Sequence, residues 1–423
     1  MECADDFQII TTPIVVDDFE INVIKKEELK SNKSILNKVS KKSNKKKEPI
    51  KLKPKWIDDT EHKESGTYYS CLDIEKVLEN ENKIKIQKFG VLNTQDFLKA
   101  GFLEFYRCID GNRDHPSSKF ISFSILHRNK MCMITASNEG TLCLFKIDGE
   151  FNNAVDRPFY VDKFPINGGQ LLPDGNNVVF FSKRSYYKVL NLATGNIKNL
   201  KIDTERIRRL EASPSGDFIV LANENTTLFV VSTATFNVIH KLHVSSTIKS
   251  LAFSHSGKYL YVYEEHGKIS VFEFQEKRGP VFCRKWFDSD GINAIRIAIS
   301  ADDQFVACGS LGLLNIYSLN DCWNTEYPKP IKSIQYPDSR VNQLQFNHSS
   351  ELLAVGFSAT ANTTTGGFRL LNMASLTVYH NFPGSVGTAR PTSFSFSPNG
   401  KYLAVGRFNG KVTLFALNHY KAF

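Results

Sequence analysis

Short apolar strands separated by tight turns recur from about Phe120 to the C-terminus. The clearest copy is an alternating Ser-Phe-Ser-Phe strand over 393–396, a Pro-Asn-Gly turn, an apolar run over 402–405, an Asn-Gly turn and a third strand over 412–417. Asn-Gly is the strongest two-residue hairpin signal, because both residues tolerate positive φ. The pattern therefore predicts antiparallel β-structure built from consecutive hairpins.

A turn quartet marks each later copy, and a weaker equivalent at His127 to Lys130 precedes them. The fourth residues of the quartets lie at positions 175, 216, 257, 303, 350 and 400. The intervals of 41, 41, 46, 47 and 50 residues are close to the ~40–45 residues of a four-stranded propeller blade. We therefore predict an all-β, seven-bladed β-propeller over 120–423, with units at 120–148, 158–192, 206–233, 247–275, 292–319, 341–373 and 391–418.

The last unit ends after its third strand, which leaves a sheet edge with unpaired backbone groups. The strand-like segment Gly101 to Asp110 precedes the first unit. We expect this segment to supply the missing outer strand and to clasp the two ends of the ring together.

Charge divides the N-terminal region into two parts. Residues 1–24 carry six acids and no Lys or Arg, whereas residues 25–55 carry 13 Lys against three Glu. Residues 25–55 are too polar to bury enough surface to offset chain entropy. We therefore expect a disordered acidic-then-basic tail over 1–55 and, over 56–119, a linker with a short helix at 72–78 and the closing strand.

The remaining composition argues against an enzyme, a metal site and a membrane protein. Eight Cys form no CxxC pair, and Cys132 and Cys308 lie in apolar runs, so we interpret them as reduced interior thiols without metal or cofactor. No apolar run approaches the ~20 residues of a membrane span. The chain also lacks a Gly-x-Ser-x-Gly elbow, a phosphate loop and a His-Glu-x-x-His motif.

The basic tail is the clearest candidate binding site. A mobile run of lysines neutralises phosphates and releases their counterions, and it also matches a nuclear-import signal. The run lacks interleaved aromatic residues for base stacking, so we expect no sequence specificity. Its lysines are Lys41, Lys42, Lys45, Lys46 and Lys47.

The repeats resemble WD repeats, although no unit ends its third strand with Trp-Asp. Several stretches further resemble the U3 small nucleolar RNA-associated WD-repeat proteins of the small-subunit processome, which belong to the UTP-B subcomplex and carry a single propeller behind a charged tail. These stretches are Pro54 to Asp59, Leu144 to Gly149, Pro328 to Lys332, Thr377 to Pro383 and Leu417 to Tyr420.

The resemblance implies a non-catalytic, nucleolar scaffold needed for pre-rRNA processing and small ribosomal subunit biogenesis. Its implied partners are other UTP-B WD-repeat proteins, U3 snoRNA and pre-rRNA. The alternatives are a generic WD-repeat adaptor, such as a ubiquitin-ligase substrate receptor, or a phosphoinositide-binding propeller. Phe368-Arg369-Leu370-Leu371 lacks the second Arg of the phosphoinositide motif.

Some members of this family carry, in the tail, a Leu-Phe-x-apolar-Asp motif that recruits the exosome's helper helicase. Here Ile14, Val15, Val16 and Asp17 keep only the end of that motif, so they are a candidate docking site. The acidic head equally suits another partner. Two better letter matches, Pro158 to Asp162 and Leu228 to Ser232, fall inside predicted blades, where we expect strand packing to hide them.

Overall fold

The structure is a computed structural model that describes residues 98–204, 206–275, 279–291, 293–359, 366–384 and 389–420. This part of the chain consists of antiparallel sheets, which confirms the predicted all-β class. Its helical elements are the short α2 (Leu319–Asn324) and a 3-10 turn at Glu265–Gly267. The predicted helix at 72–78 and the tail over 1–55 lie outside the described residues.

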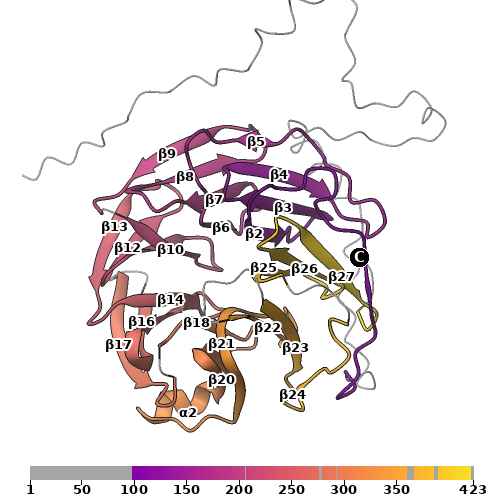
Figure 1. Cartoon of the computed structure of the whole chain (residues 1–423). Coiled ribbons are helices and arrows are strands. Elements are labelled where there is room, and N and C mark those ends of the chain that lie inside the picture. The colour runs from indigo at the N-terminus through magenta and orange to yellow at the C-terminus, as the bar shows by residue number, and fades with distance from the viewer. Residues whose placement is uncertain are drawn as a thin grey trace, which may run out of the picture. The chain divides into compact units, whose positions relative to one another are not determined.

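Seven four-stranded blades follow one another in chain order around a ring (Figure 1). The first blade consists of β2 (Ile121–Leu126), β3 (Cys132–Ser137), β4 (Thr141–Lys146) and β5 (Phe159–Tyr160), and the second consists of β6 (Gly168–Leu171), β7 (Asn177–Phe181), β8 (Tyr186–Asn191) and β9 (Ile197–Lys201). The third blade consists of β10 (Ile207–Ala212), β11 (Phe218–Asn223), β12 (Thr227–Ser232) and β13 (Val238–His243). The fourth blade consists of β14 (Ile248–Phe253), β15 (Tyr259–Glu264), β16 (Lys268–Gln275) and β17 (Gly279–Phe287).

The fifth and sixth blades share one long strand, β21 (Lys332–Phe346). Residues 332–335 pair with β20 as the outer strand of the fifth blade, and residues 339–346 pair with β22 as the inner strand of the sixth. The other strands of these two blades are β18 (Arg296–Ile299), β19 (Phe305–Gly309) and β20 (Leu311–Ser318), then β22 (Leu352–Ala359), β23 (Gly366–Asn372) and β24 (Thr377–Val378).

The clasp segment closes the seventh blade, whose other strands are β25 (Pro391–Phe396), β26 (Tyr402–Arg407) and β27 (Val412–Leu417). Strand β1 (Phe105–Arg107) pairs antiparallel with β27, and Phe105 lies opposite Leu417. The contact continues beyond the strand, because the Asn112 side chain donates to Gly410 O at 2.8 Å and accepts from Val412 N at 2.8 Å. The segment in which the sequence predicts a closing strand therefore contains one.

Each strand in the body of a blade is buried on both faces, because a blade packs between two neighbours. In β12, Leu228 and Val230 pack toward the fourth blade, whereas Phe229 and Val231 pack toward the second. Among the described residues, a separate hydrophobic cluster fills each of the seven junctions between adjacent blades. Two-sided burial is the reason that these strands read as unbroken apolar runs.

The turn quartets have the backbone geometry that their repeat predicts. The fourth residue of each has positive φ, and its N–H donates to the carbonyl of the first residue. A left-handed residue is required there, so Gly occupies four of the positions, and Asp303 and Ser350 adopt φ of 54° and 61°. The donor-acceptor distances are 2.9–3.2 Å at Gly175, Gly216, Gly257, Asp303, Ser350 and Gly400.

The expected unit bounds were wrong at the outer strands, because six of the seven units end before the fourth strand of their blade. The unit predicted over 158–192 begins with β5, but β5 pairs with β4 and is the outer strand of the first blade. Because β5 is an outer edge strand, Tyr160 is 65% exposed and Asp162 is exposed, so packing hides Val161 but not the whole of Pro158 to Asp162. By contrast, Leu228 to Val231 are buried as expected.

Carboxylates at the connections between strands stabilise the blades in place of a Trp-Asp signature. Glu139, in the turn between β3 and β4, accepts from the hydroxyls of Ser117 and Ser118. The fully buried Glu264, at the end of β15, accepts from Ser246 N at 2.9 Å and from the Ser270 hydroxyl. Both acids tie the segment before an inner strand to the body of the same blade.

Candidate functional site

The inner strands of the propeller line a central cavity of about 650 Å³. Strands β2, β6, β10, β18, β21 and β25 contribute to its wall, and they surround the middle of the ring in Figure 1. Because the first strand of each blade is the innermost, residues at the start of different inner strands converge at one end of this channel.

The charged side chains of the channel are mostly arginines. Those that line it are Arg128, Arg209, Arg296, Arg340 and Arg390, with Glu211 as the acid among the lining residues. Arg209, Arg296 and Arg340 lie near the starts of β10, of β18 and of the inner part of β21, and Arg390 directly precedes β25. Arg128 follows the end of β2. The end at which the inner strands begin is therefore strongly basic.

These arginines affect one another across the channel. Burial lowers the pKa of Arg209, and Arg296 lowers it further. Burial also lowers the pKa of Arg296, where Glu211 opposes the shift and Arg390 adds to it. Burial lowers the pKa of Arg390, and the charge of Arg340 lowers it further. One carboxylate therefore faces a group of mutually repelling guanidiniums.

Side-chain bonds between neighbouring inner strands hold the arginines in place. Arg209 Nε donates to Lys249 O at 2.5 Å, and Arg296 Nε donates to Asn342 O at 2.8 Å. Asn342 Nδ2 in turn donates to Pro391 O at 2.9 Å. Because the acceptors are uncharged backbone carbonyls, these bonds position the guanidiniums of Arg209 and Arg296 without neutralising their charge.

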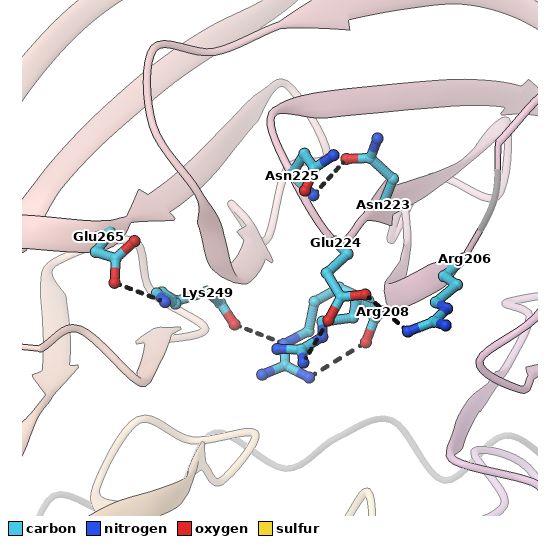
Figure 2. A network of polar contacts seen from close by, with 8 residues as sticks. Arg206, Arg208, Asn223, Glu224, Asn225, Lys249 and Glu265 are labelled. Atoms are coloured by element: carbon cyan, nitrogen blue, oxygen red, sulfur yellow. Dashed lines mark hydrogen bonds and ion pairs between the residues drawn. The ribbon is translucent and has the colours of Figure 1, made fainter.

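Ion pairs lie beside the channel, near the starts of the inner strands β10 and β14. Figure 2 shows Glu224 between Arg208, at 2.8 Å, and Arg206, at 3.6 Å, with the Lys249–Glu265 pair beside them. The Arg206, Arg208 and Glu224 side chains are 40–62% exposed, so each of their pairs contributes about 0–1 kcal/mol to stability. Arg206 and Arg208 thus share one acid as an ion-pair partner, whereas most of the arginines that line the channel form no ion pair with a described residue.

The outer edges of the third and fourth blades form a second candidate surface. Val238 and Ile239 on β13 and Val281 and Phe282 on β17 are exposed, Phe282 to 53%. The two strands approach closely, since a Cβ on Gly279 would lie 2.3 Å from His240 Nε2. Exposed apolar side chains on adjacent edge strands are typical of a protein-binding surface.

The site residues predicted from the sequence lie outside the described residues: Lys41, Lys42, Lys45, Lys46, Lys47, Ile14, Val15, Val16 and Asp17. Most of the two loops that we would expect to meet partners, 359–367 and 384–391, lies outside them as well. The channel arginines were not among the site residues predicted from the sequence. Their signal was a basic residue near the start of several inner strands, which is informative only once the ring is closed.

Of the six cysteines among the described residues, four are buried as interpreted, Cys132 is half-buried and Cys283 is exposed. Cys108, Cys143, Cys308 and Cys322 are buried free thiols, and burial raises the pKa of Cys108 and of Cys143 to about 11. Cys283 is exposed because it lies on the outer strand β17. In the part of the chain that the structure describes, no helix is long and apolar enough to span a bilayer.

The WD domain, G-beta repeat family matches residues 376–415. This stretch begins just before the outer strand β24 of the sixth blade and continues into β27 of the seventh, so the sequence repeat is offset from the structural blade by one strand. The same offset explains the misplaced boundary at β5.

The chain is similar to curated proteins from several eukaryotes. It is 28% identical over 349 residues to the U3 small nucleolar RNA-associated protein 18 homolog of Mus musculus. This alignment covers 80% of the present chain and 61% of the mouse protein. The chain is 28% identical over 324 residues to the Caenorhabditis elegans homolog, covering 74% of each. The Saccharomyces cerevisiae U3 small nucleolar RNA-associated protein 18 is 24% identical over 438 residues, which covers 88% of this chain and 72% of that protein.

Proposed function

We propose that this chain, a homologue of the U3 small nucleolar RNA-associated protein 18 proteins, is a non-catalytic, nucleolar scaffold of the small-subunit processome. In this role it supports pre-rRNA processing and small ribosomal subunit biogenesis. The observation that carries the proposal is a similarity to these proteins over 80% of the chain. Since the chain spans 61% of the mouse relative, the activity and partners of the whole protein belong to the proposal.

The proposed RNA partners are U3 snoRNA and pre-rRNA, and the lysines at 41, 42, 45, 46 and 47 are the proposed contact. Their closely spaced charge suits phosphate neutralisation without base readout, and it also suits nuclear import. Ile14 to Asp17 is the proposed docking segment for the exosome's helper helicase, because it keeps the apolar-x-apolar-Asp end of that motif.

The proposed protein partners are other WD-repeat proteins of the UTP-B subcomplex. The exposed apolar side chains on β13 and β17 support a protein interface at this edge of the propeller. A scaffold of this kind recognises its partners through such surfaces, because the other strands of each blade are buried against neighbouring blades.

Affinity purification of the full chain from cells, followed by identification of co-purified RNA and protein, tests the proposal. We expect enrichment of U3 snoRNA together with other WD-repeat processome proteins. Recovery of ubiquitin-ligase subunits without U3 snoRNA would contradict it. An unrelated propeller expressed at the same level is the control for adventitious RNA.

A further inference from the structure

The channel contains a group of positive charges that the described protein balances only in part. Arg209, Arg296, Arg340 and Arg390 come from four blades and repel one another, with Glu211 as the acid among them. Arg209, Arg296 and Arg390 are half-buried, whereas Arg340 is exposed. Partly buried like charges are unfavourable unless an ion of opposite sign joins them. The arrangement is therefore suited to an anionic ligand.

Unsatisfied polar atoms lie at the same place. Arg390 Nε, Asn342 Oδ1 and Thr392 Oγ1 are buried without hydrogen-bond partners, and all three residues line the channel. Arg390 also stacks over the Phe408 ring at 5.9 Å, which orients its guanidinium. Buried polar groups normally find partners, so a small rearrangement of this part of the channel wall around a ligand would be favourable.

We propose that the end of the central channel at which the inner strands begin binds a compact, soluble anion that carries several phosphate groups. Guanidiniums bind phosphate oxygens bidentately, and four of them in one wall match several phosphates close together. A cavity of about 650 Å³ lies within the size range of small-molecule sites and is too small for a folded RNA.

An acidic peptide fits the site less well. Its carboxylates carry one charge each and are spaced along an extended chain, whereas the arginines converge around one cavity. This site goes beyond the proposed scaffold function and does not depend on it: the chain can associate with U3 snoRNA whether or not its channel holds an anion.

Isothermal titration calorimetry of the full chain with inositol hexakisphosphate tests the inference. We expect saturable one-to-one binding that weakens as salt is raised, and an upward shift of the melting temperature with ligand. Arg390→Gln should weaken binding about tenfold, because one charge-assisted contact is lost. Arg340→Gln, at an exposed side chain, should act in the same direction and provides a second variant if Arg390→Gln fails to fold.

The matched control is Arg157→Gln, which removes the same charge from an exposed loop away from the channel. It should bind inositol hexakisphosphate like the unaltered chain. The inference is overturned by absent or non-saturable binding, by equal weakening in Arg157→Gln, or by tighter binding of a penta-glutamate peptide. Retention on vesicles containing phosphatidylinositol bisphosphate, lost in Arg390→Gln, would overturn the assignment to a soluble anion and favour a lipid headgroup.

Discussion

Asp288 is a buried carboxylate that joins the fourth and fifth blades. It accepts from Tyr263 OH at 2.7 Å within its own blade, and from Tyr317 OH at 2.6 Å and Asn315 Nδ2 at 2.7 Å in the next. Burial, and then nearby charges that include Asp288, raise the pKa of Tyr317. The hydroxyls therefore remain protonated donors, and one acid satisfies three buried groups.

Replacing Asp288 by Ala should destabilise the propeller by about 3–5 kcal/mol, because buried donors would lose their acceptor. Urea unfolding followed by circular dichroism measures this change. Asp290→Ala, at an exposed neighbour, is the control and should change stability by less than about 0.5 kcal/mol. Equal effects of the two substitutions would show that the Asp288 network is not stabilising.

Glu211 makes stability depend on pH. Burial raises its pKa to about 7, against the opposing effects of the Gln170 hydrogen bond and of Arg296. A folded pKa above the unfolded value means that ionisation disfavours the folded state. Stability from this group is therefore full below about pH 4.5, falls as the pH rises to about 7, and is then constant.

Glu211→Gln should remove this loss and be about 1–2 kcal/mol more stable than the unaltered chain at pH 8, allowing for screening by water in the channel. The two proteins should differ little at pH 4.5. Urea unfolding at both pH values measures the difference. A variant that is less stable at pH 8 would mean that the charge of Glu211, by neutralising Arg296, outweighs its burial.

At the scale of elements, the closing segment holds the ring shut through a buried side chain as well as through strand pairing. Leu103 is 2% exposed and packs in the cluster between the sixth and seventh blades, whereas its neighbour Phe102 is 64% exposed. Leu103 is also fixed through its backbone, which bonds the Asn381 side chain in both directions.

Leu103→Ala should cost about 2–5 kcal/mol, as expected for truncation of a buried leucine, and should lower the melting temperature. Phe102→Ala, one residue away on the exposed side, should leave it nearly unchanged. Differential scanning calorimetry compares the two variants. If both variants have the melting temperature of the unaltered chain, the closing segment does not contribute to the stability of the ring.

The edge formed by β13 and β17 is expected to bind protein rather than to stabilise the fold. Phe282→Asp should abolish or strongly reduce recovery of WD-repeat partners in affinity purification while leaving the melting temperature unchanged, because a charge prevents burial of this surface in an interface. Phe151→Asp, at an equally exposed aromatic residue of another blade, is the control. Partner loss in both variants would argue against a specific edge.

For the whole molecule, the tail and the propeller are expected to act separately. Deleting residues 25–55 should reduce recovery of U3 snoRNA and nuclear entry without changing the melting temperature of the propeller, because the net positive charge of the N-terminal region lies there. Adding a foreign import signal to the deletion should restore nuclear entry but not RNA recovery. Full RNA recovery by the imported deletion variant would assign RNA association to the propeller or its partners.

The sequence by itself determined the class of fold, the number and order of blades and the segment that closes the ring. These are local properties: positive φ at Gly175 or Gly400 is required by a four-residue turn, and apolar strand runs between such turns follow from burial on both faces. The longer interval between turn quartets in the later repeats is also visible in the sequence. In the fifth blade, helix α2 accounts for part of this extra length.

The tertiary structure decided which distant residues meet. Arg209 and Arg390 are far apart in the chain, yet ring closure places both in one channel; Asp288 finds its partners in two blades; and β21 serves two blades as one strand. The exposure of Tyr160 likewise depends on β5 lying at the outer edge of the first blade. Such contacts depend on how each blade is placed against its neighbours, and no local pattern of residues specifies that placement.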